Sequence, residues 1–195
     1  MEYILKQINA LVPLSPATED ALRSCLAYCH FPKRCLLVES GRRAGSAFFI
    51  RRGITRSYWL VDGEEITTSF STEGGIVFSM DELYYDKPSE EFVETLEECD
   101  AYRIALADLR RLFATNLELA NWGRIIHQNE YRRLHRSHKD RLTLPAAHRY
   151  ESFCRQFPGV ARRVQLGFIA SYLGITLSTL SRLRGQRQHY LSQDK

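Results

Sequence analysis

The stretch from Leu166 to Leu183, LGFIASYLGITLSTLSRL, decides the fold of the C-terminal part of the chain. Two helices that meet at a tight turn need a small residue at their contact and a residue that tolerates positive φ at the turn. Ala170 meets the first need, and Gly174, four residues later, meets the second. The other apolar side chains have the spacing of an inner helical face: Ile169, Leu173, Ile175, Leu180 and Leu183. The stretch therefore predicts a helix-turn-helix.

The outward side of the second helix is polar. Thr176 stands where a helix cap is needed. The outward positions carry groups that can bond base edges in a major groove: Ser178, Thr179 and Arg182. The flanking arginines are suited to phosphate contacts: Arg162, Arg163, Arg184 and Arg187. We predict DNA contacts from Thr176, Ser178, Thr179, Arg182 and Arg184. A helical hairpin inside a core would use Ala170 and Gly174 in the same way, and it is the alternative.

The charge distribution supports a basic C-terminal half. The net charge is +4, but residues 1–102 hold 10 Lys and Arg against 17 Asp and Glu. Residues 103–195 hold 17 basic and 6 acidic residues. Such asymmetry favours a polyanionic partner for the second half, although a solvated basic helix surface would have the same composition.

Upstream of the long helical region, the pattern is that of short strands. Ser15 and Pro16 open a leading helix, because serine can cap it and proline suits its first position. From about Phe31, glycines recur roughly every ten residues, as they do in small β-barrels and sandwiches. Asp62-Gly63 predicts a hairpin turn between arms 54–61 and 64–70. The closing strands are expected at 92–96 and 101–106.

A long helix is expected from about residue 108 to residue 141. Leu112, Leu119 and Ile126 recur every seven residues, and Trp122 lies on the same stripe. We predict that this stripe is the seam of a homodimer; the alternative is that it packs on the barrel. Leu144-Pro145 ends the helix, because proline cannot continue it.

Together these patterns predict an α+β fold. A jelly-roll-like β-barrel sensor domain takes residues 1–107, a dimerisation helix and hinge take 108–142, and a winged-helix-like helix-turn-helix domain takes 143–195. Only 11 residues follow Arg184, which is short for a wing hairpin.

Several classes of protein are disfavoured. No nucleophile elbow, phosphate-binding loop or His-Glu-x-x-His motif occurs, so we predict no enzyme. The five cysteines contain no CxxC pair, and we predict neither a disulfide framework nor a metal site. His30 and His127 are haem candidates by residue type alone. No segment has the length and apolarity of a membrane span or a signal peptide, so a cytoplasmic protein is expected.

The order of these elements resembles the Crp/Fnr family of transcription regulators. The resemblance covers nearly the whole chain, and its best local matches are 48–53 (FFIRRG) and 169–176 (IASYLGIT). It implies a homodimer with one recognition helix per half-site of a near-palindrome. It also leaves RNA polymerase and a small-molecule effector open as partners.

The family's functional positions carry over only in part. Cyclic-nucleotide binders of the family have a Gly-Glu pair and an arginine that holds the cyclic phosphate, whereas the corresponding positions here hold Phe78-Ser79 and Ser89. Glu90 and Glu91 stand beside Ser89 and would repel a phosphate. The Arg-Glu pair that opens the recognition helix in the best-known members is replaced by Leu177-Ser178, while Arg182 matches a base-reading arginine.

The prediction is a DNA-binding transcription regulator of the Crp/Fnr type whose effector is not cyclic AMP. No cofactor is predicted, and the sequence identifies no cofactor-binding residue. The alternative is a protein-interaction or ligand-sensing module that kept the fold and lost specific DNA binding. An effector is expected to rotate the helix-turn-helix about a hinge at residues 142–145.

Overall fold

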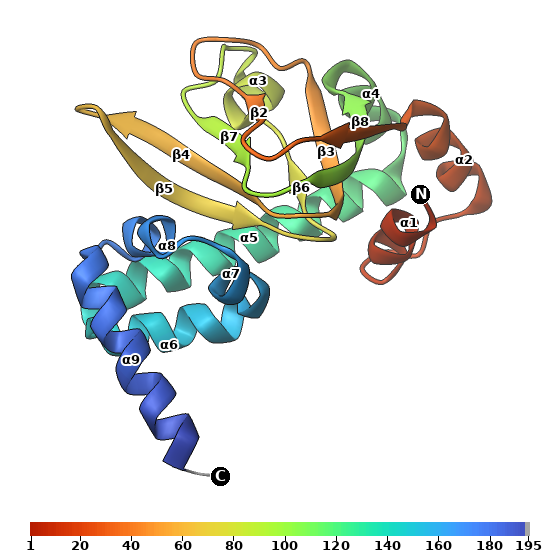
Figure 1. The fold of residues 1–195 in the computed structure, drawn as a ribbon. Helices are drawn as coiled ribbons and strands as arrows, with labels where there is room; N and C mark the ends of the chain where they lie inside the picture. Colours follow the sequence, from red (N-terminus) through yellow and green to blue (C-terminus); the bar gives the residue numbers. More distant parts are fainter. Residues whose placement is uncertain (194–195) are drawn as a thin grey trace.

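The computed structural model describes the chain from residue 1 to residue 193, with side chains described to Gln186. Two antiparallel four-stranded sheets form the N-terminal barrel (Figure 1). The first sheet has the order β1-β8-β3-β6, with β1 (Ala27–Phe31), β8 (Cys99–Ala105), β3 (Ser46–Arg52) and β6 (Ile76–Val77). The second has the order β2-β7-β4-β5, with β2 (Leu36–Val38), β7 (Phe92–Thr95), β4 (Thr55–Val61) and β5 (Glu64–Ser71).

The predicted hairpin is confirmed. Asp62 and Gly63 have φ of 51° and 83°, so both turn residues are left-handed, as a type I′ turn requires. The resulting β4–β5 hairpin is long and extends beyond the barrel, and its strand β5 runs alongside α8 (Leu166–Leu173) of the C-terminal helices (Figure 1). The turn chemistry thereby sets the position of the strand that meets the C-terminal unit.

Three short helices lie on the barrel: α1 (Glu2–Asn9), α2 (Pro16–Cys25) and α3 (Met80–Tyr85). The Ser15 hydroxyl accepts a hydrogen bond from the Thr18 backbone N–H, which confirms the predicted cap of α2. The apolar sides of α1 and α2 are buried with Ile104 and Phe49 of the first sheet.

The prediction of a single long helix after residue 107 is wrong. It is divided into α4 (Leu106–Thr115) and α5 (Leu117–Thr143) by Asn116, whose side chain accepts a hydrogen bond from the Leu119 backbone N–H and caps α5. An asparagine that caps a new helix offers the backbone an alternative to continuing the old one. α5 then extends from the barrel to the C-terminal helices (Figure 1).

The predicted dimer seam is also wrong. Leu112, Leu119 and Trp122 are each at most 5% exposed and belong to the barrel's own hydrophobic core. Ile126 is half-buried against the same core. Trp122 stacks on Phe49 of β3, with 5.8 Å between ring centroids. The alternative, that the stripe packs on the barrel, is the correct one, because a buried side chain cannot also form a seam with a second chain.

The C-terminal unit consists of four helices: α6 (Ala146–Gln156), α7 (Pro158–Arg163), α8 (Leu166–Leu173) and α9 (Leu177–Gln193). α5 ends directly before Leu144-Pro145, as expected. No strand follows β8 within residues 1–193, so this part of the chain holds no wing hairpin.

No single helix among the described residues is long and apolar enough to cross a membrane. Only α8 and α9 taken together, with a bend of 104° between them, reach that length and composition.

Candidate nucleic-acid interface

The helix-turn-helix predicted at 166–183 is present. The chain bends by 104° between α8 and α9, within the range of about 90–120° typical of the motif. Gly174 has φ of +63°, the left-handed conformation that the turn requires. Ala170, Leu180 and Ile169 are at most 3% exposed in a common core, and Ile175 and Leu183 pack against it. The turn between α8 and α9 is therefore formed by the glycine and the apolar residues of the predicted stretch.

The start of α9 is a cluster of hydroxyl groups. The Thr176 Oγ1 accepts a hydrogen bond from the Thr179 backbone N–H at 3.2 Å and lies 3.0 Å from the Ser178 Oγ. The cap predicted for Thr176 is therefore formed. The same oxygen lies 2.9 Å from the Thr179 Oγ1, so the hydroxyls of all three residues are held together at the N-terminal end of the helix.

Exposure separates the five expected contact residues. Thr176, Ser178 and Arg182 are exposed, whereas Thr179 and Arg184 are half-buried. The first three are thus accessible on one helix and its cap, and a major groove is wide enough to admit a helix. Thr179 and Arg184 present only part of their surface.

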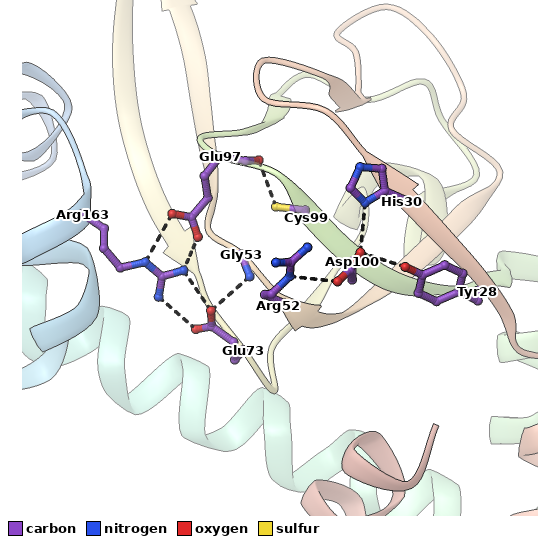
Figure 2. Close-up of polar contacts among 9 residues, drawn as sticks. All are labelled: Tyr28, His30, Arg52, Gly53, Glu73, Glu97, Cys99, Asp100 and Arg163. Atoms are coloured by element: carbon purple, nitrogen blue, oxygen red, sulfur yellow. Dashed lines mark hydrogen bonds and ion pairs between the residues drawn. The ribbon is translucent and has the colours of Figure 1, made fainter.

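The flanking arginines do not all lie free for phosphate. Arg162 is exposed, but Arg163, on α7, is bound to two carboxylates of the barrel (Figure 2). Its Nη2 lies 3.0 Å from Glu73 Oε1, its Nε donates to Glu97 Oε2 at 3.2 Å, and Nη2 also pairs with Glu97 Oε1. The expectation that Arg163 serves the phosphates is therefore not met in this conformation. The side chain of Arg187 lies outside the described part of the chain.

The carboxylates that hold Arg163 are themselves fixed. Burial tends to raise the pKa of Glu73, but hydrogen bonds from Arg163 and the Gly53 backbone N–H outweigh it and leave that pKa lowered. Figure 2 shows Glu73 and Glu97 reaching Arg163 from two different loops of the barrel. A guanidinium fork that spans two carboxylates is a specific, directional contact. We call these three residues the Arg163 latch.

A second contact joins α8 to β5. The Thr67 backbone N–H donates to Ser171 Oγ at 2.9 Å, and the Ser171 hydroxyl donates to the Glu65 carbonyl oxygen at 3.1 Å. Phe70 of β5 packs on Phe153 and Tyr172 of the C-terminal unit, with ring centroids 6.0 and 5.6 Å apart. The helix that supports α9 is thus bonded and packed directly against the barrel hairpin.

Arg56 is the residue at this contact that sequence reasoning missed. It is 1% exposed, its guanidinium lies 3.8 Å from the Phe168 ring centroid and 4.2 Å from that of Tyr58, and it pairs with Glu65 and Glu94. Its Nε and Nη1 have no hydrogen-bond partner among the described atoms. The sequence pattern places Arg56 in a strand but gives no sign of its partner. That partner, Phe168 of α8, lies 112 residues further along the chain.

The serines at the positions that correspond to the cyclic-nucleotide contacts of the resembled family are buried in the barrel. Ser79 is fully buried and caps α3, accepting from the Glu82 backbone N–H. Ser89 is 2% exposed, and its backbone exchanges hydrogen bonds with Gly41 and Arg42. The Glu82 carboxylate accepts the Ala44 and Gly45 backbone N–H groups at 2.8 Å.

The acidic pair beside Ser89 has an unusual environment. Burial, and next the charge of Asp81, raise the pKa of Glu91 to about 7, while Glu90 is exposed. Where these carboxyl groups are ionised, their negative charge disfavours a bound phosphate.

The cysteines and histidines considered as metal ligands are dispersed. No group of three or more His, Cys, Asp or Glu side chains with metal-binding geometry occurs in the described part of the chain. His30 Nδ1 lies 2.9 Å from Asp100 Oδ1 (Figure 2). His127 Nε2 lies within hydrogen-bond distance of the Tyr84 hydroxyl. Asp100 also accepts from Tyr28 and Arg52, and its pKa is lowered to about 2, mainly through His30.

Known proteins share this architecture. Residues 28–116 match the family of the cyclic nucleotide-binding domain. A structure from Eubacterium rectale described as a regulator of the Crp/Fnr family aligns with a TM-score of 0.71 at 16% identity, over 91% of this chain and 85% of that one. The chain has the fold of the Crp/Fnr transcription regulators.

Two further structures with this Crp/Fnr fold extend the comparison. FixK2 from Bradyrhizobium japonicum aligns with a TM-score of 0.75 at 18% identity over 85% of each chain. CLP from Xanthomonas campestris, described as a c-di-GMP-responsive global regulator, aligns with a TM-score of 0.64 at 18% identity, over 90% of this chain and 92% of that one. No curated protein matches the sequence.

Proposed function

We propose that the protein is a DNA-binding transcription regulator that reads DNA with α9. The observation that carries the proposal is the helix-turn-helix itself, whose second helix exposes Ser178 and Arg182 while its inner side is buried. Serine can bond any base edge, and an arginine fork matches the O6 and N7 acceptors of guanine. α8, not α9, is the helix packed most extensively on the barrel, which leaves the outward side of α9 accessible.

The proposed regulator acts as a homodimer through the second half of α5. Exposed side chains recur there with helical spacing: Tyr131, Leu134, His138 and Leu142. Tyr131 and Leu142 are 69% and 71% exposed, which is costly for apolar groups in water. Two copies joined along this stripe would present two recognition helices to half-sites about one helical turn apart.

The dimer proposal is tested by changing the stripe. Leu134→Arg is expected to convert the protein to a monomer in analytical ultracentrifugation, because it places a charge in the seam. Leu36→Arg, at an equally exposed leucine of β2, is the control and should leave the mass unchanged. A dimer that survives Leu134→Arg would contradict the proposed seam.

The proposed effector is not cyclic AMP, since Ser79 and Ser89 are buried and bonded within the barrel loops. The regulator would work in the cytoplasm, where DNA and RNA polymerase are available to it.

The first experiment is selection of random duplex DNA by the purified protein at physiological salt, followed by sequencing of what it retains. Enrichment of a two-fold-symmetric motif is the expected result. Retention without sequence preference, or none, even with cell extract added, would favour the alternative of an interaction module that has lost specific DNA binding.

A further inference from the structure

A cleft whose lining includes six arginines lies between the second half of α5 and the helices α6 and α8. Its volume is about 520 Å³. The charged residues that line it are Arg132, Arg133, Arg136, Asp140, Arg141, Arg149 and Arg155. Six guanidinium groups therefore face one carboxylate. We propose that this cleft binds a small molecule that carries at least two phosphate groups.

Most of these arginines lack an acidic partner. Arg133 pairs with Glu130, but the other five arginines make no ion pair within the described residues. Arg141 donates to the Tyr172 carbonyl oxygen at 2.8 Å, and Arg155 to Ser152 Oγ at 3.1 Å, which positions both without neutralising them. The Arg149 Nε is buried and has no hydrogen-bond partner there. Like charges gathered in a concave site repel one another, and a bound anion would relieve that repulsion.

The chemistry of the lining selects phosphate. A guanidinium presents a planar fork of N–H donors that matches two phosphate oxygens, and several forks in one cleft suit several phosphates. Asn129, Ser137 and Gln156 add neutral hydrogen-bonding groups. The aromatic side chains of the lining, Phe153 and Tyr172, are at most 7% exposed, so they form a floor and offer little surface for stacking.

The shape and place of the cleft favour a small molecule over DNA. A volume of about 520 Å³ lies within the range of roughly 300–1,000 Å³ typical of small-molecule pockets. None of the described residues that line it belongs to α9. At about 100° per residue, Arg132, Arg136 and Asp140 lie on the side of α5 opposite Tyr131 and His138, so the proposed dimer seam leaves that wall of the cleft open. Arg141 lies on the same side as Leu134, beside the seam.

A ligand in the cleft would join the two sides of the hinge. One wall belongs to α5, and the other to α6 and α8, which follow Leu144-Pro145. Neutralising both walls at once would draw them together. The proposed phosphate site uses no described residue of α9, so it can be tested separately from the proposed DNA recognition.

The test is isothermal titration calorimetry of the full chain with sodium tripolyphosphate at a fixed ionic strength of about 0.15 M, where surface charges are largely screened. One saturable site per chain is expected. Arg136→Gln and Arg149→Gln should each weaken binding by about tenfold, and Arg51→Gln and Arg103→Gln, at exposed barrel arginines, should not. Orthophosphate should bind more weakly than tripolyphosphate. Absence of saturation, or equal weakening by the barrel variants, would overturn the proposal.

A second arm distinguishes the phosphates of a small molecule from those of DNA. Retention of duplex DNA by wild type and by Arg136→Gln is compared. Unchanged retention together with weakened tripolyphosphate binding supports the small-molecule site. If Arg136→Gln weakens both duplex retention and tripolyphosphate binding, and the duplex competes fully with tripolyphosphate, the cleft contacts the DNA backbone. That result would overturn the inference. Wild-type protein that binds tripolyphosphate but no DNA would contradict the proposed function alone.

Discussion

At the scale of single residues, Arg182 is the side chain on which base reading depends most. It is exposed on α9, and no ion pair holds it within the described residues. Arg182→Ala should weaken binding to the selected duplex by about 10–100-fold, because a bidentate arginine–guanine contact discriminates by about 1–3 kcal/mol. Fluorescence anisotropy measures the change. Gln186→Ala, exposed on the same helix, serves as control, and wild-type affinity in Arg182→Ala would refute the assignment.

Glu91 gives a prediction about pH. Its pKa in the folded protein is about 7, above the ordinary value of 4.5, because of burial and then the charge of Asp81. The folded state therefore holds this proton more tightly, and the associated stability is present below about pH 4.5 and lost as pH rises through 7. Glu91→Gln should exceed the wild type in free energy of unfolding at pH 8 by about 1–3 kcal/mol.

Urea unfolding of wild type and Glu91→Gln from pH 4.5 to pH 8 measures this difference, which should shrink towards the acid end. Glu90→Gln is the matched control, since the neighbouring side chain is exposed. A constant difference across the pH range would show that Glu91 does not titrate as described.

At the scale of secondary-structure elements, Gly174 fixes the angle between α8 and α9. Its φ of +63° is strained for any residue with a Cβ, although a Cβ there would meet no atom closer than 3.9 Å. Gly174→Ala should therefore destabilise the protein by about 1–2 kcal/mol through the backbone alone. Gly167→Ala, within α8 and surrounded by open space, should be neutral or stabilising. Equal thermal stability of the two variants would contradict this explanation.

Elements were predictable where the signal is local. The β4–β5 hairpin, the start of α2 and the helix-turn-helix each depend on two to four neighbouring residues, so their sequence pattern suffices. The division between α4 and α5 was missed because Asn116 competes with a continuing apolar period. The strand placement of Arg56 was predictable, but its burial against Phe168 was not.

At the scale of the whole molecule, the Arg163 latch and the α8–β5 contact hold the helix-turn-helix against the barrel. Replacing both latch carboxylates, as Glu73→Gln/Glu97→Gln, should loosen that contact. Each exposed ion pair contributes only about 0–1 kcal/mol, so the expected effect is modest. We expect hydrogen exchange at the Thr67 amide, which donates to Ser171, to become about fivefold faster, as about 1 kcal/mol implies.

Exchange measured by NMR or mass spectrometry tests this expectation. Glu98→Gln, an exposed neighbour of Glu97, should leave the exchange at Thr67 unchanged. If the double variant also leaves it unchanged, the latch does not hold the two units together.

The sequence by itself determined the order of elements, the hairpin turn at Asp62-Gly63 and the helix-turn-helix around Gly174, because those features are encoded by local backbone preferences and short-range spacing. Only the tertiary structure decided which apolar stripe is available to a partner. The heptad spacing predicts a dimer seam at Leu112, Leu119 and Trp122, but the barrel covers these side chains. The exposed stripe from Tyr131 to Leu142 lies further along α5. The tertiary structure also decided that Arg163 meets Glu73 and Glu97, and that six arginines surround one cleft. These contacts join residues distant in the chain, and periodicity carries no information about which surfaces meet.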